Sequence, residues 1–202
     1  DYTEASIQVL EGLVPVRKRP GMYIGSTDER GLHHLINEIV DNSVDEFMAG
    51  HCDEIYIHID NDQYVEITDN GRGIPVEKHS TTKKSTVETV LTTLHAGGKF
   101  EQGAYQVSGG LHGVGASAVN ALSEDFIVSV YREGKTHTMS FSEGVKTVDL
   151  STVDLPNNEK SRTGTKIRFK ADTTIFIDDE TKKPLDYDFN KILARTKEIA
   201  YL

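Results

Sequence analysis

Residues 31–49 carry apolar side chains at every third or fourth position, which is the spacing of one face of an α-helix. Ser26 or Thr27 is suited to cap such a helix at its start, and Gly50 is suited to end it. We therefore predict one long helix over this segment, from about Gly31 to Ala49. Its apolar face consists of Leu32, Leu35, Ile36, Ile39, Val40, Val44 and Phe47.

After this helix the apolar period changes to two, which is typical of β-strands. Residues 55–59 alternate isoleucine with more polar side chains, and residues 64–68 repeat the pattern after the turn Asn61-Asp62. Together the two segments predict a β-hairpin. Before the long helix, an apolar cluster from Ile7 to Val16 ends in a basic run, and glycines beyond it predict a turn at Gly21 to Gly25.

The second half of the chain has strand patterns separated by turns such as Glu133-Gly134, and these predict an antiparallel meander. Helices that precede antiparallel strands favour an α+β fold over a doubly wound one. We therefore predict a two-layer sandwich of helices on a mixed, mostly antiparallel sheet. The predicted strands span residues 126–131, 136–141, 145–150 and 165–169, and further helices span residues 87–94, residues 116–122 and a segment from about Asp188.

Composition and charge narrow the class of protein. The 202 residues suit one globular domain, and no apolar stretch reaches the roughly 18 residues of a membrane-spanning helix. The start of the chain lacks a basic and apolar leader, so we expect no secretory signal. Cys52 is the only cysteine, which excludes an internal disulfide and favours the cytoplasm. The net charge of −10 predicts little direct contact with DNA, because DNA binding requires basic side chains to neutralise phosphates.

Glu38, Asn42 and Asp45 share one face of the predicted long helix, at spacings of four and three residues. Taken alone, such a stripe is more often a solvated surface. The alternative is a catalytic face. In that case the amide oxygen of Asn42 binds the magnesium ion of a nucleotide, and Glu38 deprotonates an attacking water.

Asp69 ends the second predicted strand and is followed by Gly71 and Gly73. The ordinary interpretation is a turn, in which Asp, Asn and Gly supply backbone freedom. The alternative is a half-buried carboxylate that accepts a hydrogen bond from the exocyclic amine of adenine. Glycines beside it would let a planar base approach the backbone closely.

A glycine-rich segment, Ser108 to Gly115, leads directly into a predicted helix. Its freed backbone N–H groups indicate a phosphate site, with a surface loop as the alternative. Gly134-Lys135-Thr136 is not a P-loop, because Ser129 holds the position of the earlier glycine, and residues 113–118 match the dinucleotide fingerprint without the strand it requires. The eight histidines show no metal-ligand spacing, since the adjacent His33 and His34 diverge on a helix.

The order of these three motifs resembles that of the GHKL ATPases, which include type II topoisomerases, MutL proteins, heat-shock chaperones and sensor histidine kinases. The boxes are Glu38 to Asn42, Asp69 to Gly73, and Gly109 to Gly115. Three longer strings, residues 16–25, 94–100 and 108–115, resemble the B subunits of the bacterial type II topoisomerases, DNA gyrase and topoisomerase IV. This resemblance covers essentially the whole chain, although residues 77–84 are more polar and basic than the family pattern.

The resemblance implies a role for each site residue. Glu38 is implied to be the general base, Asn42 the magnesium ligand, and Asp69 the acceptor for the adenine amine, with Thr165 supporting Asp69 through water. Glu46 and Arg72 are implied to border the pocket. The other implied nucleotide contacts are Ser43, Gly73, Lys99 and Tyr105, an apolar wall of Ile39, Ile67, Ile74, Pro75, Val90 and Ile167, and a phosphate lid of Gly110, Leu111, His112, Gly113, Val114, Gly115 and Ala116.

The resemblance also implies how the chain is organised. It predicts one ATP-binding domain over residues 1–202, with an N-terminal arm at residues 1–15 and a lid at residues 97–117. Tyr2 and Ile7 resemble arm residues that reach into the partner subunit, so we expect a homodimer on ATP binding. Arg132 resembles the arginine that aminocoumarin antibiotics use.

The implied function is the ATPase domain of a type II DNA topoisomerase that uses ATP and Mg²⁺ and works with DNA and an A subunit, away from membranes. A MutL-like or chaperone-like ATPase module that signals to protein partners is the alternative. The family's second domain, the transducer, supplies a lysine to the terminal phosphate and would lie beyond Leu202. We therefore expect the chain alone to bind ATP but to hydrolyse it slowly.

Overall fold

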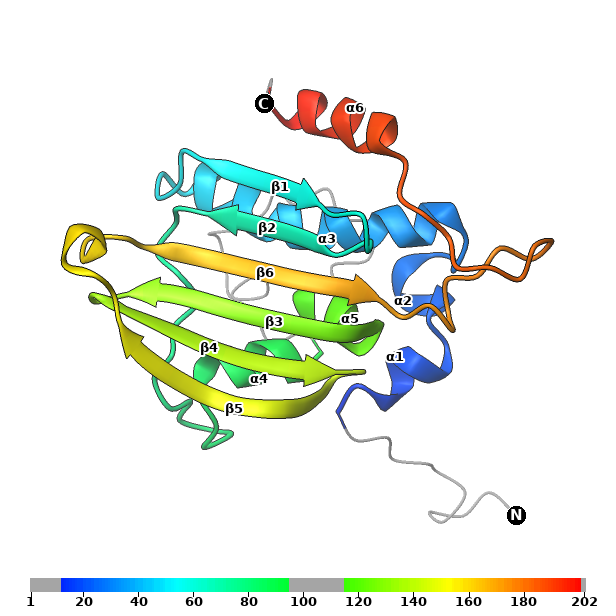
Figure 1. Cartoon of the computed structure of the whole chain (residues 1–202). Helices are drawn as coiled ribbons and strands as arrows, with labels where there is room; N and C mark the ends of the chain where they lie inside the picture. The colour runs from blue at the N-terminus through cyan, green and yellow to red at the C-terminus, as the bar shows by residue number, and fades with distance from the viewer. Residues whose placement is uncertain (1–11, 95–114, 201–202) are drawn as a thin grey trace, which may run out of the picture.

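The computed structural model describes residues 12–94 and 115–200. Its strands are β1 (Ile55–Ile59), β2 (Val65–Asp69), β3 (Ser123–Arg132), β4 (Lys135–Ser142), β5 (Val145–Asp154) and β6 (Gly164–Ala171). Its helices are α1 (Val14–Lys18), α2 (Gly21–Ile24), α3 (Glu29–Met48), α4 (Thr86–Thr92), α5 (Gly115–Ala121) and α6 (Phe189–Ala200), with a 3-10 helix at Asn157–Glu159. Helices α3, α4 and α5 cover one face of the sheet (Figure 1). All pairings between the described strands are antiparallel, and the predicted α+β sandwich is confirmed.

The strand order is β1-β2-β6-β3-β4-β5, so the last strand returns to the middle of the sheet. Ile67 of β2 and Val128 of β3 both pair with Ile167 of β6. The predicted simple meander is therefore wrong for β6, although β3, β4 and β5 do follow one another. This insertion places the start of β6 beside the end of β2, where Asp69 lies. A Cβ atom on Gly164 would lie 2.0 Å from the carbonyl oxygen of Asp69, so only glycine permits this approach.

Helix α3 begins two residues before the predicted start and is capped by a different residue. The carboxylate of Asp28 accepts hydrogen bonds from the backbone N–H groups of Arg30 and Gly31, so Asp28, not Ser26 or Thr27, is the N-cap. The hydroxyl of Ser26 donates to Asp28 at 2.6 Å, and this hydrogen bond is the main cause that lowers the pKa of Asp28. Ser26 therefore supports the cap through its hydroxyl.

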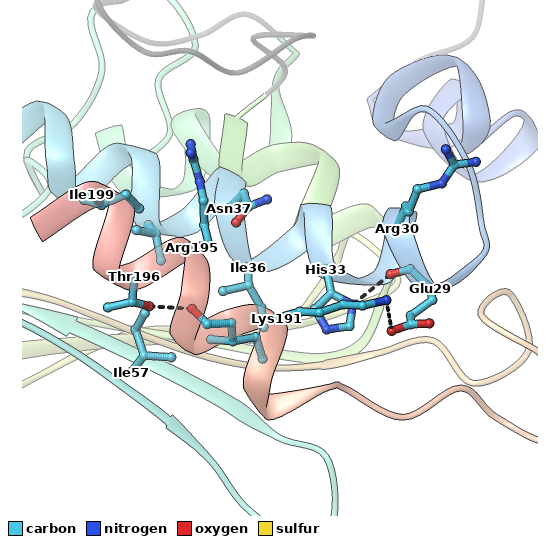
Figure 2. A pocket seen from close by; sticks show the side chains of 12 residues that line it. Glu29, Arg30, His33, Ile36, Asn37, Ile57, Lys191, Arg195, Thr196 and Ile199 are labelled. Atoms are coloured by element: carbon cyan, nitrogen blue, oxygen red, sulfur yellow. Dashed lines mark hydrogen bonds and ion pairs between the residues drawn. The ribbon is translucent and has the colours of Figure 1, made fainter. Parts of the chain in front are cut away.

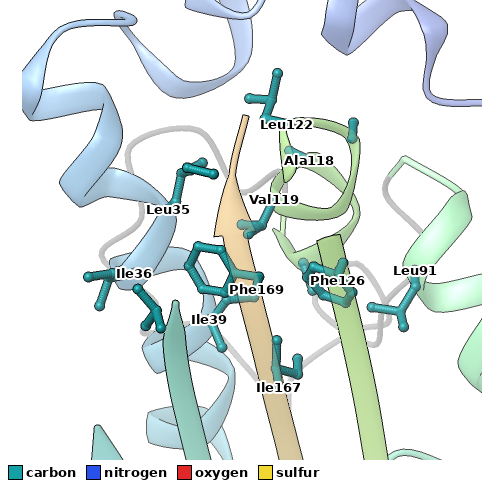
Figure 3. Close-up of a cluster of buried hydrophobic side chains, with 14 of the residues drawn as sticks. Leu35, Ile36, Ile39, Leu91, Ala118, Val119, Leu122, Phe126, Ile167 and Phe169 are labelled. Atoms are coloured by element: carbon teal, nitrogen blue, oxygen red, sulfur yellow. The ribbon is translucent and has the colours of Figure 1, made fainter. Parts of the chain in front are cut away.

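The core lies between the sheet and helices α3, α4 and α5 (Figure 3). Phe126 of β3 stacks on Phe169 of β6 with ring centroids 6.4 Å apart and meets Phe141 of β4 edge to face at 6.3 Å. Leu35 of α3 and Leu122 close this layer from the helical side. Burying one such side chain contributes about 1.5–3 kcal/mol to the free energy of unfolding. This packing gives α3 a rigid position over the sheet.

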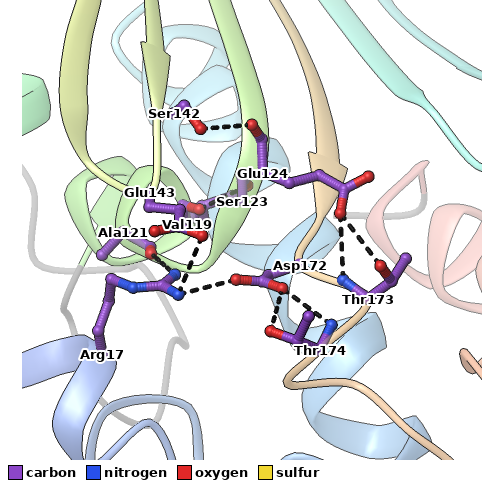
Figure 4. A network of polar contacts seen from close by, with 10 residues as sticks. All are labelled: Arg17, Val119, Ala121, Ser123, Glu124, Ser142, Glu143, Asp172, Thr173 and Thr174. Atoms are coloured by element: carbon purple, nitrogen blue, oxygen red, sulfur yellow. Dashed lines mark hydrogen bonds and ion pairs between the residues drawn. The ribbon is translucent and has the colours of Figure 1, made fainter.

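Helix α2 replaces the turn predicted at Gly21 to Gly25, and Arg17 anchors the preceding helix, α1, to the body of the protein (Figure 4). Its guanidinium donates to the carbonyl of Ala121 and to the carboxylate of Asp172, both at 2.8 Å. Asp172 also accepts from the backbone N–H and the hydroxyl of Thr174. Burial acts to raise the pKa of Asp172, but the hydrogen bonds from Thr174 and Arg17 outweigh it and the pKa is lowered.

Candidate functional site

Asp69 stands at the end of β2, and three donors fix its carboxylate. Oδ2 accepts from the hydroxyl of Ser43 at 2.7 Å, and Oδ1 accepts from the backbone N–H groups of Gly71 at 3.0 Å and Thr165 at 3.3 Å. The hydroxyl of Thr165 accepts from the backbone N–H of Ile74 at 3.2 Å. The site thus joins α3, the end of β2, the turn after it and the start of β6. Thr165 contacts Asp69 directly through its backbone.

The turn after Asp69 is tightly packed at Gly73, whose φ is +81°. A Cβ atom there would lie 3.0 Å from atoms of Arg132, Gly164 and Val130. A side chain at this position would therefore be strained by the backbone conformation and would displace its neighbours. The guanidinium of Arg132, at the end of β3, donates to the carbonyl of Gly73 at 2.9 Å and holds the turn from its other side.

Arg72 and Glu46 form a bidentate pair beside this turn. Arg72 Nη2 lies 2.6 Å from Glu46 Oε1, while its Nε and backbone N–H donate to Oε2 at 3.2 and 3.0 Å. Burial acts to raise the pKa of Glu46, but the hydrogen bonds and charge of Arg72 outweigh it and the pKa is lowered. Glu46 therefore ties α3 to the turn as a carboxylate.

Glu38 lies on the same helix and is almost fully enclosed, with 1% of its side chain exposed. Its Oε2 accepts from the backbone N–H of Gly115 at 3.0 Å, and the first residue of α5 thereby meets α3. Its Oε1 lies 3.0 Å from Nε2 of His34, one helical turn earlier. Asp45 is also buried. The solvated-stripe interpretation is therefore wrong, and these carboxylates face the interior.

Asn42 is half-buried on α3 between Glu38 and Glu46. Within the described residues no group of three or more His, Cys, Asp or Glu side chains is arranged to hold a metal ion. Magnesium, however, prefers oxygen ligands and commonly takes only one or two from the protein, with water and phosphate supplying the others. An amide oxygen one turn from a buried carboxylate fits that donor set.

The predicted apolar wall divides into two groups. Ile39, Ile67 and Ile167 are buried core residues of α3, β2 and β6. Ile74 and Val90 are half-buried, and Pro75 is exposed. Gly115 and Ala116 belong to the first turn of α5, so the predicted lid overlaps a helix there. The predicted residues that lie outside the described part of the chain are Tyr2, Ile7, Lys99, Tyr105, Gly110, Leu111, His112, Gly113 and Val114.

His34 is one residue that sequence reasoning did not select. Only its metal-ligand potential was considered there, although its spacing of four residues from Glu38 places both side chains on one helical face. Gly164 is another, because its role depends on β6 entering the sheet beside β2. A local sequence pattern carries no signal for such a long-range approach.

Comparisons with known proteins agree with this geometry. A family model described as histidine kinase-, DNA gyrase B-, and HSP90-like ATPase matches residues 27–175. The chain is 54% identical, over its whole length, to the DNA gyrase B subunits of Halalkalibacterium halodurans and Synechocystis, and it covers 30% and 18% of those proteins. It thus spans less than a third of the length of these relatives.

A solved structure shows the same fold. The crystal structure of the 43K ATPase domain of Thermus thermophilus gyrase B in complex with an aminocoumarin superposes with a TM-score of 0.80 at 44% sequence identity. The match covers 98% of this chain and 47% of that one. None of the helices in the described residues is long and apolar enough to cross a membrane.

Proposed function

The chain belongs to the family of histidine kinase-, DNA gyrase B- and HSP90-like ATPases, and from this we propose that it is the ATP-binding and ATP-hydrolysing domain of a DNA gyrase of the bacterial type, within its B subunit. The proposal rests on two carboxylates whose positions are set by α3: Glu38 belongs to this helix, and Asp69, at the end of β2, is hydrogen-bonded to it. Glu38 is buried against Gly115, and Asp69 is held by Ser43 of the same helix. A helix fixed by its core packing sets the distance between the two.

Asp69 is the acceptor for the adenine amine in this proposal. Its carboxylate already accepts three hydrogen bonds from Ser43, Gly71 and Thr165, so its orientation is set before the base arrives. Preorganised acceptors bind more tightly because no side-chain rotamer has to be fixed on binding. A carboxylate accepts but does not donate, which selects an amine over a carbonyl at that edge of the base.

Asn42 is the protein ligand for Mg²⁺ in this proposal. When bound, Mg²⁺ would neutralise the negative charge that develops on the phosphates during phosphoryl transfer. The amide side chain of Asn42 lies one turn from Glu38, so its oxygen and the Glu38 carboxylate act from the same rigid helix. The glycine-rich segment before α5 would supply backbone N–H groups to the phosphates, while the N–H of Gly115 holds Glu38.

Glu38 is the general base. It orients a water molecule, accepts its proton as the water oxygen bonds to the terminal phosphorus, and the bond from that phosphorus to the ADP oxygen breaks. The N–H of Gly115 fixes one carboxylate oxygen and His34 lies beside the other, so the base has a defined orientation. His34 acts through Glu38 and is a positioning residue.

The activity of the whole protein goes beyond this chain. We propose that ATP binding drives homodimerisation and DNA strand passage with an A subunit in the cytoplasm, and that aminocoumarins compete for the same site next to Arg132. The relatives support a gyrase role, and the structural neighbour is an aminocoumarin complex. The net charge of −10 fits a domain that leaves most DNA contacts to other parts of the assembly.

Isothermal titration with a non-hydrolysable ATP analogue and Mg²⁺ tests the site. Asp69→Asn should weaken binding by roughly tenfold or more. Asparagine replaces one carboxylate oxygen by an NH₂ group, which would place a donor against the adenine amine in a fixed position. Glu38→Gln should leave this affinity within about twofold while ATP turnover of the full-length protein falls roughly 10²- to 10⁴-fold. Asp62→Asn, in an exposed turn, is the matched control.

Two results would contradict the assignment: unchanged binding by Asp69→Asn, or unchanged turnover by Glu38→Gln. DNA supercoiling by the full-length protein with its A subunit separates the gyrase role from the MutL-like or chaperone-like alternative. ATP turnover without any change in DNA topology would favour the alternative.

A further inference from the structure

A cavity of about 280 Å³ lies between α3 and α6 (Figure 2), and neither Asp69 nor Glu38 lines it. Its floor consists of branched aliphatic side chains. They are Ile36 and Val40 of α3, Ile57 of β1, and Ile192 and Ile199 of α6. A cavity of roughly 150 Å³ with a similar apolar lining is enough to bind benzene. This one has about twice that volume, so it accommodates a bicyclic ring or a short branched chain.

The rim of the cavity is basic. Arg30, Lys191 and Arg195 line it together with a single acidic residue, Glu29, in a chain whose net charge is −10. Lys191 pairs with Glu29 at 2.7 Å. Arg30 and Arg195 lie 3.4 and 3.2 Å from carboxylates of Asp28 and Glu198, which do not line the cavity. These ion pairs are exposed, so each contributes little to stability. An incoming anion can therefore take the place of the carboxylate in such a pair.

Two further polar side chains line the cavity on α3. Both ring nitrogens of His33 are already occupied, since they contact the backbone of Glu29 and Asp188. The half-buried amide of Asn37, by contrast, makes no hydrogen bond to the described residues. Asn37 and Arg195 both line the cavity, Asn37 from α3 and Arg195 from α6 (Figure 2). A guanidinium and a neighbouring amide are the donors that a carboxylate accepts from.

We propose that this cavity is a second binding site, for a small amphipathic carboxylate whose apolar body rests on the isoleucine floor and whose anionic head lies between Arg195 and Asn37. Its lining residues on α3 are on a different face of the helix from Glu38 and Asn42. The site is thus independent of the nucleotide site, and its occupant and ATP bind at the same time. A purely polar anion would not displace water from the apolar floor. A neutral apolar molecule would not pair with the basic side chains of the rim.

Titration calorimetry with 2-naphthoate tests this proposal on the whole chain, and the uncharged 2-naphthamide serves as the matched probe. We expect saturable 1:1 binding of the carboxylate, with roughly tenfold weaker binding of the amide because the charge-assisted hydrogen bonds are lost. Saturating ATP analogue and Mg²⁺ should leave the naphthoate affinity within about twofold.

Three variants locate the bound probe. Arg195→Gln should weaken naphthoate binding roughly tenfold, and Thr196→Phe, which fills the cavity from α6, should abolish it. Lys197→Gln makes the same charge change on the same helix at a residue that does not line the cavity, so it should leave binding unchanged. All three should bind the ATP analogue as the unaltered chain does.

The proposal is overturned if naphthoate does not bind, if Arg195→Gln and Lys197→Gln bind it equally, or if the ATP analogue displaces it. Analytical ultracentrifugation, which measures self-association of the chain, provides a further test. Concentration-dependent self-association that Thr196→Phe abolishes would show that a second copy of the chain occupies this face, and the small-molecule assignment would then be wrong.

Discussion

At the scale of single residues, Glu38 and Asp69 are held in different ways, and this suits them to different tasks. Asp69 accepts from a hydroxyl and two backbone N–H groups, so its charge is spread over fixed donors next to a glycine turn. Glu38 Oε2 accepts from the backbone N–H of Gly115, and Oε1 lies beside the imidazole of His34. Asp69 is thus tied to the turn after β2 and to β6, whereas Glu38 is tied to the start of α5.

The contact between His34 and Glu38 predicts a kinetic effect. His34→Ala in the full-length protein should lower kcat roughly tenfold, a part of what the base itself supplies, and should leave KM for ATP within about twofold. His34→Gln keeps a donor at this position and should recover part of kcat. Steady-state ATPase kinetics measure both values, with the exposed His58→Ala as the control. An equal loss in His34→Ala and His34→Gln would contradict the positioning role.

The hydroxyl of Tyr187 predicts a gain in stability when it is removed. It is buried, burial raises its pKa, and it has no hydrogen-bond partner in the described part of the chain. Tyr187→Phe keeps the edge contact with His33 and should raise the free energy of unfolding by about 1 kcal/mol, or the Tm by roughly 2–4 °C.

Tyr64→Phe is the matched control for that prediction. The phenol of Tyr64 donates to Asp125 at 2.8 Å, and burial together with this hydrogen bond raises its pKa to about 12. Removing this hydroxyl should lower the Tm, whereas removing that of Tyr187 should raise it. Differential scanning calorimetry distinguishes the two, and a lower Tm for Tyr187→Phe would show that its hydroxyl is satisfied.

At the scale of elements, most of the fold follows from periodicity, and the remainder depends on long-range contacts. The 3.6-residue period of α3 and the two-residue period of β1 and β2 are local, and the predicted segments lie within about two residues of the observed ones. The predicted N-cap is wrong, because Ser26, Thr27 and Asp28 are all suitable residue types and the hydrogen bonds that Asp28 accepts from Arg30 and Gly31 leave no mark in the sequence. The position of β6 depends on pairing partners far apart in sequence.

The candidate site follows the same division. Glu38, Asn42 and Asp69 are predicted from motifs whose chemical groups lie within a few residues of one another. The donors that hold Asp69 come from three separate elements, and only the resemblance, rather than any spacing, pointed to Ser43 and Thr165. Local spacing could have identified His34, because it lies one helical turn from Glu38.

The anchoring of α1 predicts a pH-dependent stability. Arg17→Met leaves the carboxylate of Asp172, which is 2% exposed, without its cation and should cost about 3 kcal/mol at pH 7. The folded-state pKa of Asp172 is lowered, so the contribution is complete above the ordinary Asp range. It is lost as the pH falls below about 4, through the folded-state pKa, and the difference between the two proteins should then narrow.

Urea unfolding at pH 7 and at successively lower pH values measures this difference. Lys18→Met is the control, because it makes the same charge change at the next residue of α1 on an exposed side chain. It should change the free energy of unfolding by less than about 0.5 kcal/mol. A difference for Arg17→Met that is constant over the whole pH range would show that packing, rather than the ion pair, anchors the helix.

At the scale of the whole molecule, the distribution of charge bears on whether this chain can contact DNA. Basic side chains line up along β6 on the face of the sheet that lies opposite the helices. There Arg168 lies 3.0 Å from a carboxylate of Asp60, and Lys170 lies 3.4 Å from one of Glu124. Arg168 and Lys170 are thus already paired with carboxylates, and the chain as a whole carries a net charge of −10.

This distribution predicts that the chain alone binds duplex DNA poorly. Few phosphates can be neutralised, so few counterions are released, and binding should be weaker than about 10 µM at physiological salt, within the range of non-specific contacts. Fluorescence anisotropy with a labelled duplex at several salt concentrations measures both the affinity and its salt dependence. A Kd below about 1 µM with a steep salt slope would contradict the prediction and would place a DNA-binding surface on this domain. Changing Glu124 to Gln frees Lys170 and should steepen the salt slope, which ties any binding observed to the β6 face of the sheet.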